Sequence, residues 1–414
     1  MSPFDLSVLF FLQMAFILAV CRVAGWIFRQ LGQSQVVSEM IAGVMMGPSV
    51  LGWLAPDFSA MLFPKASQPI LLVISQLGLV LYMFLIGVDF DLDLIRSRMR
   101  SAASVSLAGI LAPFALGAGL AWSVWGDTRL FSPQTTVTQA MLFMGAAMSI
   151  TAFPMLARII HEQGLARTPL GTLALAAGAM DDVAAWCVLA LVLASFQQQP
   201  SIAFLAIGGG AVFALLTLTF MRRALIPLGR SVEAAGVLGP NALALVLLLV
   251  MLGAWFTDSI QIYAVFGAFV VGLAMPRGTL TRELHRLLHP LTTSLLLPVF
   301  FVYSGLHTRM GLVETPALAW LAVLVLLAAT GGKGVACYLA ARWHGERHRD
   351  ALAVGTLMNA RGLMELIILN IGLQRGVIAP ALFAIMVLMA IVTTLMATPI
   401  FQRVYPPGTP RTGA

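Results

Sequence analysis

Long apolar stretches alternate with short polar segments along the entire chain. Thirteen such stretches can be distinguished, and most approach the roughly 20 residues that an α-helix needs to cross a bilayer. Their apolar positions are continuous rather than alternating over about 10 residues, which argues against a transmembrane β-barrel. The pattern therefore predicts an all-α polytopic membrane protein with about thirteen transmembrane helices. The expected spans are 5–29, 35–54, 69–88, 102–125, 137–160, 170–195, 202–221, 238–257, 260–276, 288–306, 316–341, 350–373 and 379–401.

Composition supports this fold class. Hydrophobic residues make up 60% of the chain and charged residues only 10%, with a mean hydropathy of +0.94, whereas soluble domains carry about 25% charged residues. No soluble segment is left to house an enzyme, so we expect a non-enzymatic protein embedded in the lipid bilayer, without a resident cofactor. The net charge of +7 is better explained by loop arginines that fix orientation than by an acidic partner such as a nucleic acid.

The distribution of basic residues predicts the orientation. Of the 24 lysines and arginines, 17 fall in loops or the tail on one side of the predicted membrane and 4 on the other. Positive residues concentrate in cytoplasmic loops. We therefore expect a multi-pass protein of the inner cell membrane, with its N-terminus outside and its C-terminus in the cytoplasm.

Two neighbouring carboxylates, Asp181 and Asp182, lie near the middle of the apolar stretch 170–195. A charged side chain at that depth costs at least about 2.5–3.5 kcal/mol on insertion scales, and two adjacent negative charges also repel each other. The pair therefore favours a bound proton or a bound metal cation, which is the chemistry of a proton-coupled cation transporter. The alternative is a structural pair of carboxylates that neighbouring helices satisfy.

Lysine usage indicates a partner for this pair. Among the 24 basic residues only Lys65 and Lys333 are lysines, and Lys333 lies deep in the stretch 316–341. A lysine can release its proton in an apolar site, whereas an arginine effectively cannot. We therefore expect Lys333 to pair with one carboxylate of the aspartate pair. The alternative is a lysine that extends from near a helix end to the membrane surface.

Two spans carry polar and small residues where a smooth helix would be apolar. In the fifth span we expect an unwound stretch at Ser149–Phe153, because Pro154 disfavours helix in the residue before it; an ordinary proline kink is the alternative. In the twelfth span, Arg361 and Glu365 are four residues apart and share one helix face. We expect them to form an ion pair that steadies an interrupted helix, in preference to direct contact with an ion.

The two interrupted spans belong to an internal repeat. Residues 102–195 and 316–401 each comprise a plain helix, an interrupted helix and a helix with a polar centre, which is Asp181-Asp182 in the first and Thr393-Thr394 in the second. The interrupted helices begin on opposite sides of the membrane, so the two triplets are inverted relative to each other. Inverted repeats with paired broken helices place an ion site near the midplane of the bilayer.

Seven short motifs are Leu31–Ser49, Leu77–Gly87, Thr151–Arg158, Ala179–Val183, Gly332–Gly334, Asn359–Leu366 and Leu369–Gly372. Together they resemble the monovalent cation:proton antiporter family 2, the sodium/hydrogen exchanger-like transporters. The resemblance covers essentially the whole chain. The last two motifs are most similar to the plant cation/proton exchanger branch and its bacterial relatives.

This resemblance implies the sodium/proton antiporter fold, with two crossing discontinuous helices, and exchange of Na⁺ or K⁺ for protons by alternating access. It also implies a homodimer in which a mobile core carries the ion past a dimerisation scaffold. The implied divisions are a transmembrane domain, 1–402, with core helices 102–195 and 316–401 and scaffold helices 5–54 and 202–276, followed by a short cytoplasmic tail, 403–414.

The resemblance also implies roles for single residues. Asp182 would be the main ion- and proton-binding carboxylate, Asp181 would pair with Lys333, and Thr151 would line the site. The two aspartates would then be the ligands of the transported Na⁺ or K⁺. An Asp-Asp pair in this family goes with electrogenic exchange, which moves more than one proton per cation.

Three other classes of function, an ion channel, an intramembrane protease and a sensor, make different demands on the sequence. An ion channel needs a repeated selectivity-filter loop, and the sequence contains none. An intramembrane aspartyl protease needs two aspartates on different helices, whereas Asp181 and Asp182 are neighbours about 100° apart on one helix. A transporter-like sensor without turnover remains an alternative that only a flux measurement separates.

Overall fold

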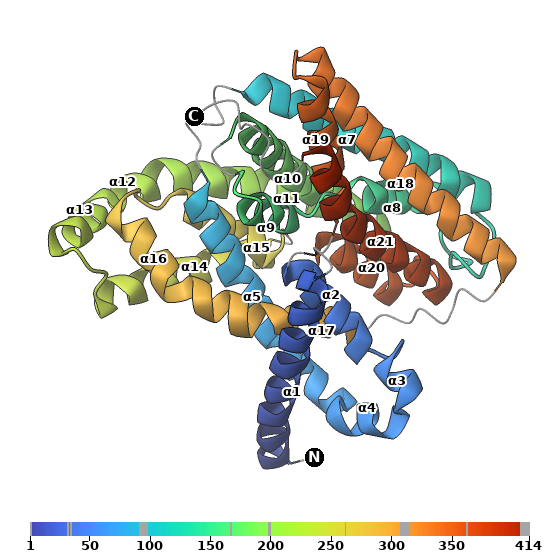
Figure 1. The fold of residues 1–414 in the computed structure, drawn as a ribbon, viewed down its shortest axis with the longest axis horizontal. Coiled ribbons are helices and arrows are strands. Elements are labelled where there is room, and N and C mark those ends of the chain that lie inside the picture. Colours follow the sequence, from blue (N-terminus) through green and yellow to red (C-terminus); the bar gives the residue numbers. More distant parts are fainter. Residues whose placement is uncertain are drawn as a thin grey trace.

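The computed structural model describes residues 2–30, 33, 35–90, 98–165, 168–197, 200–260, 262–306, 315–361 and 363–405. This part of the chain is helical almost throughout, and within it extended backbone pairs only at an isolated bridge between Phe131 and Ile378. The helices gather into two groups (Figure 1). The predicted all-α membrane fold is confirmed.

One group, the core group, contains the helices of both predicted triplets, which lie together in the centre and on the right of Figure 1 although they are far apart in the sequence. Its members are α7 (Met99–Val124), α8 (Val137–Ser149), α9 (Phe153–Glu162), α10 (Pro169–Gln197), α18 (Pro316–Trp343), α19 (His348–Leu357), α20 (Leu363–Gln374) and α21 (Pro380–Val404).

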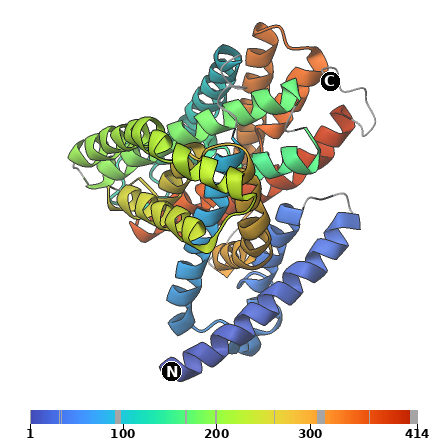
Figure 2. The ribbon, with the colours of Figure 1, turned by 90° about the vertical axis from the view of Figure 1, so that its left-hand side faces the viewer.

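The other group, the scaffold group, contains the helices that precede and separate the triplets. In Figure 2 the green-to-yellow helices of this group face the viewer, and α1 lies at the opposite end of the molecule from α18. Its members are α1 (Pro3–Gln30), α2 (Gln35–Met46), α3 (Leu51–Leu54), α4 (Pro56–Leu62), η1 (Lys65–Ser67), α5 (Gln68–Asp89), α11 (Pro200–Leu216), η2 (Thr217–Met221), α12 (Arg222–Ala224), α13 (Ile226–Ala235), α14 (Pro240–Ser259), α15 (Ala264–Leu273), α16 (Thr279–Leu291), η3 (Thr292–Leu296) and α17 (Leu297–Leu306). That the core group moves and the scaffold group dimerises stays a prediction.

Nine helices in the described part of the chain are long and apolar enough to cross a membrane, so the predicted number of thirteen is not confirmed. Two of the other four predicted spans, 137–160 and 350–373, are each divided into two short helices. A third, 260–276, forms only the 10-residue α15. The fourth forms the 29-residue α10. The count of nine helices does not cover all residues of α10.

Both interruptions have a local cause. Helix α8 stops after Ser149 because Ile150 adopts an extended backbone (φ −68°, ψ 133°), and α9 starts three residues later, inside the stretch predicted to unwind. Pro154 falls in the first turn of α9, where its missing N–H is not needed. Helix α19 ends at Leu357 and α20 begins at Leu363. The chain therefore has the two discontinuous helices that its sequence predicted.

Glycines allow close helix contacts in the scaffold group. A Cβ atom on Gly43 of α2 would overlap the backbone carbonyl of Phe301 on α17, and one on Gly305 would overlap the backbone of Gly43. Membrane helices associate largely through such close packing of small residues. The two glycines therefore determine how near α2 and α17 can approach.

Replacing Gly43 by Ala should lower the melting temperature of the detergent-solubilised protein, because overpacking costs typically 1–3 kcal/mol. Gly331→Ala on α18 is the matched control, since no atom lies within 4 Å of its added Cβ. That control should be neutral or stabilising, because glycine inside a helix is roughly 0.5–1 kcal/mol less favourable than alanine. Equal melting temperatures for the two variants would contradict the close contact.

Candidate functional site

The two interrupted helices cross in the core group, and their unwound segments bond to each other. The backbone N–H of Ala152 donates to the carbonyl of Ala360 over 3.1 Å. The hydroxyl of Thr394 on α21 accepts from the Arg361 N–H (3.1 Å), and its single hydrogen is shared between the carbonyls of Ala390 (2.7 Å) and Arg361 (2.8 Å). Non-helical backbone is tolerated at membrane depth only where its polar groups are satisfied inside the protein. These bonds supply that satisfaction for one side of the crossing.

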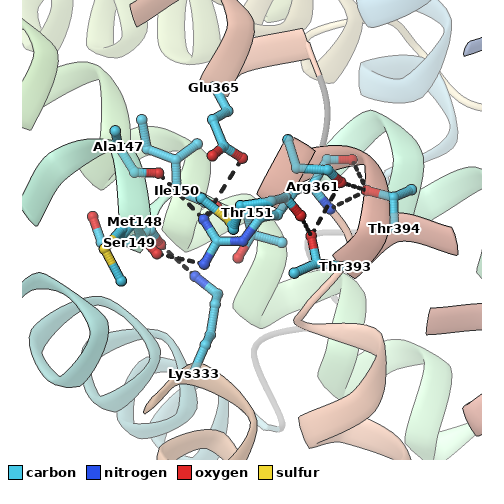
Figure 3. Close-up of polar contacts among 12 residues, drawn as sticks. Ala147, Met148, Ser149, Ile150, Thr151, Lys333, Arg361, Glu365, Thr393 and Thr394 are labelled. Carbon is cyan, nitrogen blue, oxygen red and sulfur yellow. Dashed lines mark hydrogen bonds and ion pairs between the residues drawn. The ribbon is translucent and has the colours of Figure 1, made fainter. Parts of the chain in front are cut away.

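Two buried cations satisfy the other side, the C-terminal end of α8. The last four carbonyls of any α-helix lack intrahelical partners, and a helix C-terminus carries partial negative charge. The guanidinium of Arg361 donates to the carbonyls of Ala147 (3.2 Å), Met148 (2.5 Å) and Ile150 (3.4 Å). The ammonium of Lys333 donates to the carbonyl of Ser149. Figure 3 shows the two side chains approaching this helix end from different elements.

Lys333 also contacts the first aspartate. Its Nζ lies 3.0 Å from Asp181 Oδ2, and both side chains are fully buried. The Thr151 hydroxyl lies 2.6 Å from the same oxygen and 3.3 Å from the Met358 carbonyl, so its hydrogen serves the carboxylate first. Thr151 is thus held between α10 and the end of α19. The other oxygen of Asp181, Oδ1, has no hydrogen-bond partner among the described residues.

Asp182 has much less support than its neighbour. It is only 5% exposed, yet neither of its oxygens forms a hydrogen bond of ordinary geometry within the described chain. It interacts at longer range with the backbone N–H of Phe153, the first residue of α9, where a helix carries partial positive charge. Together with Asp181 Oδ1, the aspartate pair therefore presents three buried acceptor oxygens that lack a hydrogen bond of ordinary geometry among the described residues.

The aspartate-bearing helix also forms part of the boundary between the two groups. Val183 and Cys187 on α10 line an apolar cavity whose other walls come from α11 and α15 of the scaffold group, including Ile207 and Phe269. The residue after Asp182 thus faces the scaffold group, so the helix that carries the carboxylate pair lies at the surface between core and scaffold.

The structure brings most of the predicted site residues to one place. Asp181, Lys333 and Thr151 are in direct contact, Asp182 is adjacent, and Arg361 reaches the same helix end as Lys333. Glu365 lies further off, with Oε2 3.7 Å from Arg361 Nη1. Their roles in ion binding stay predictions at this point.

Two features of the site are not predicted by the sequence. Arg361 was expected to pair chiefly with Glu365, but its hydrogen bonds go to the end of α8. Thr394 was noted only as part of a polar helix centre, whereas it holds the backbone of the crossing. One signal in the sequence could have indicated these bonds: Arg361 lies in one interrupted span, and the other interrupted span leaves helix carbonyls without partners.

Comparison with known proteins identifies the family. The family model "Sodium/hydrogen exchanger, transmembrane" matches residues 15–404. The chain belongs to the sodium/hydrogen exchanger family. The resemblance drawn from the motifs is thereby confirmed. Members of this family are transporters and not enzymes, so the enzyme and channel alternatives are set aside for this exchanger-family chain.

Two curated relatives show how the match extends. The chain is 39% identical over 392 residues to the Na(+)/H(+) antiporter NhaS4 of Synechocystis, covering 94% of this chain and 95% of that protein. It is 35% identical over 410 residues to cation/H(+) antiporter 15 of Arabidopsis thaliana, covering 98% of this chain but only 49% of that protein. The chain thus spans about half the length of this plant relative.

The fold also matches a solved exchanger-family structure. An electron-microscopy map of the sodium proton antiporter MjNhaP1 from Methanocaldococcus jannaschii superposes with a TM-score of 0.67 and 15% sequence identity, over 97% of this chain and 96% of that one. At this identity the likeness concerns the arrangement of helices alone, and it agrees with the antiporter fold implied by the motifs.

Replacing Arg361 by Gln should lower the melting temperature strongly, because hydrogen bonds to charged groups contribute about 1.5–3 kcal/mol each and two carbonyls of α8 and the carbonyl of Ile150 would lose theirs. Arg98→Gln is the matched control. Arg98 pairs with Glu346 over 2.6 Å where both side chains are partly exposed, and exposed ion pairs contribute about 0–1 kcal/mol. Equal small losses in thermal unfolding would show that Arg361 does not cap α8.

Proposed function

We propose that this chain is a secondary active antiporter that exchanges a monovalent cation, Na⁺ or K⁺, for protons by alternating access. The observation that carries the proposal is the aspartate pair beside Lys333, of which three buried acceptor oxygens have no hydrogen-bond partner among the described residues. Carboxylate oxygens suit hard cations, and a buried charge without a partner is strongly unfavourable. The site therefore favours either a proton or an alkali cation at Asp182.

The charges of the site describe the exchange. In the cation-free site, Asp181 and Lys333 carry opposite charges, and a proton on Asp182 leaves the group neutral. An entering cation replaces that proton and also attracts Asp181. Lys333 then loses its partner and can release its own proton, because lysine deprotonates readily when buried. Two protons leave for one cation, so the exchange moves net charge and is electrogenic.

The remaining parts of the proposal concern movement and assembly. The core group would carry the loaded aspartates past the scaffold group, with α10 sliding along the apolar surface formed by α11 and α15. The scaffold helices present wide apolar faces, including Phe204 on α11 and Trp255 on α14, which would meet lipid or the second subunit of a homodimer. The orientation proposed is a cytoplasmic C-terminus in the inner cell membrane.

Asp182→Asn should reduce cation-driven proton flux in proteoliposomes to the level of empty liposomes, because the amide can bind neither the proton nor the cation in the required charge state. Flux is measured with an internal pH dye after addition of sodium or potassium. Asp258→Asn, an exposed aspartate near the end of α14, is the matched control and should transport normally. Undiminished flux in Asp182→Asn would refute the assignment of the site.

Lys333→Gln should make the exchange insensitive to membrane potential. Without the lysine, two adjacent carboxylates share one proton, and one proton then leaves for one cation. In the native protein each net charge moved is worth about 2.3 kcal/mol per 100 mV. Flux is compared with the potential clamped by an ionophore at several values, and Lys65→Gln is the control because Lys65 is exposed.

Lys333→Gln should also melt at a lower temperature, since Asp181 and the Ser149 carbonyl both lose a partner. A variant that matches the native protein in both voltage dependence and melting temperature would count against the pairing.

A further inference from the structure

Glu365 is a buried carboxylate that the exchange scheme does not use. It lies in the first turn of α20 and is 0% exposed, and neither of its oxygens has a hydrogen-bond partner among the described residues. Its neighbour Arg361 approaches to 3.7 Å, whereas a charge-assisted hydrogen bond spans about 2.7–2.9 Å. Buried ionised carboxylates are normally paired and hydrogen-bonded at once, and Glu365 does not meet that requirement.

The hydrogen bonds of Arg361 explain the gap. Both terminal nitrogens of its guanidinium donate to the carbonyl end of α8, and its Nε has no partner in the described part of the chain. In the described part of the chain, one donor and two acceptor oxygens therefore stay without a partner, although their side chains belong to residues only four apart in the sequence. By comparison, Arg98 and Glu346 close to 2.6 Å at the surface. Figure 3 shows the Arg361 guanidinium between the end of α8 and the Glu365 carboxylate, with dashed lines to both.

Opposing influences act on the charge of Glu365. Burial without hydrogen bonds favours the protonated form, whereas Arg361 and the N-terminal end of α20 favour the ionised form. Of the elements packed against α20, α8 carries no titratable side chain and α21 carries only Arg403, in its last turn. Residues of α2 and α17 line a small cavity together with one residue of α20, and these two helices carry the buried Glu39 and the partly buried Tyr303. The charge of Glu365 therefore depends on its surroundings, and its incomplete pairing leaves its oxygens free to take a proton from groups of the described chain or from solvent.

Glu365 is also linked to the aspartate pair. Lys333 and Arg361 bind neighbouring carbonyls at the end of α8. In addition, the charges of Lys333 and Glu365 are close enough to interact, as are those of Asp181 and Arg361. Positive charge that arrives at the aspartates must therefore disfavour a proton on Glu365.

We propose that Glu365 is a second proton-binding site of this protein, separate from the aspartate pair, and that its proton and the cation bound at the aspartates oppose each other. The inference rests on the proposed antiport function and adds a carboxylate whose proton regulates the affinity for the cation and is not one of the two protons exchanged. Arg361 acts as the link, since it lies between Glu365 and the shared end of α8.

Glu365→Gln tests this proposal through the pH dependence of the KM for sodium or potassium. Each proton that competes with the cation changes KM by about tenfold per pH unit on the acidic limb of the profile. One pH unit should therefore change the KM of the native protein by a factor about ten times as large as the factor by which it changes the KM of Glu365→Gln. Glu346→Gln, which removes a glutamate from the surface pair with Arg98, is the matched control and should keep the native slope.

A second measurement reads the proton directly. Infrared difference spectra of the purified protein, with and without added NaCl or KCl, should show a protonated carboxylic acid band that decreases when the cation binds. Part of that decrease should be missing in Glu365→Gln and present in Glu346→Gln. This measurement needs no transport activity, so it separates the inference from the proposed function.

The possible outcomes are distinct. A native slope or an unchanged infrared difference in Glu365→Gln would overturn the inference. Failure of Glu365→Gln to fold would overturn it as well, because glutamine imitates the protonated side chain that the proposal requires the folded protein to accept. Undiminished flux in Asp182→Asn would instead refute the antiport site, and the infrared band of Glu365 would remain.

Discussion

The carbonyl groups at the C-terminal end of α8 impose the constraint on which the rest of the site depends. A helix that stops inside a membrane leaves its last carbonyls without partners, and no bulk water is available to replace them. Here Arg361 and Lys333 donate hydrogen bonds to these carbonyls, and both residues lie far from α8 in the sequence. Once two cations are buried, carboxylates must lie near them, because unpaired charges are not tolerated there. The broken helix thus requires the cations, and the cations require the acids.

The opposite helix ends follow the same rule. The N-terminus of α9 interacts with Asp182, and the first turn of α20 contains Glu365, so carboxylates lie where backbone N–H groups supply partial positive charge. Transporters with discontinuous helices use half-helix ends in this way to line an ion site. The crossing therefore arranges four helix ends and five charged side chains so that each side chain meets a backbone charge of opposite sign or a neighbour of opposite charge.

Much of this arrangement could be predicted from the sequence, because its signals are local. Pro154 after a run of small residues indicated the interruption at 150–152, and a rare lysine in an apolar span suggested a partner for an aspartate. The bonds of Arg361 to α8 could not be predicted in the same way. Its sequence neighbour Glu365 satisfied a local rule, the i,i+4 pair, whereas its real partners depend on how two distant helices cross. The number of spans is not confirmed for a related reason, since hydropathy does not distinguish one long helix from two half-helices.

The numbers of acids and bases at the crossing determine what the site can exchange. Asp181, Asp182 and Glu365 face Lys333 and Arg361, so the fully ionised group carries one excess negative charge. One proton or one alkali cation restores neutrality, and either can do so because the excess belongs to a buried group with free acceptor oxygens. The contacts also show where the excess is located. Lys333 pairs with Asp181, and the carboxylate paired with Arg361 is that of Glu365. Asp182 is therefore the acid without a basic partner. Proton and cation thus compete because one buried carboxylate, Asp182, has no basic partner. Any further proton exchanged must come from an ion pair that the bound cation weakens.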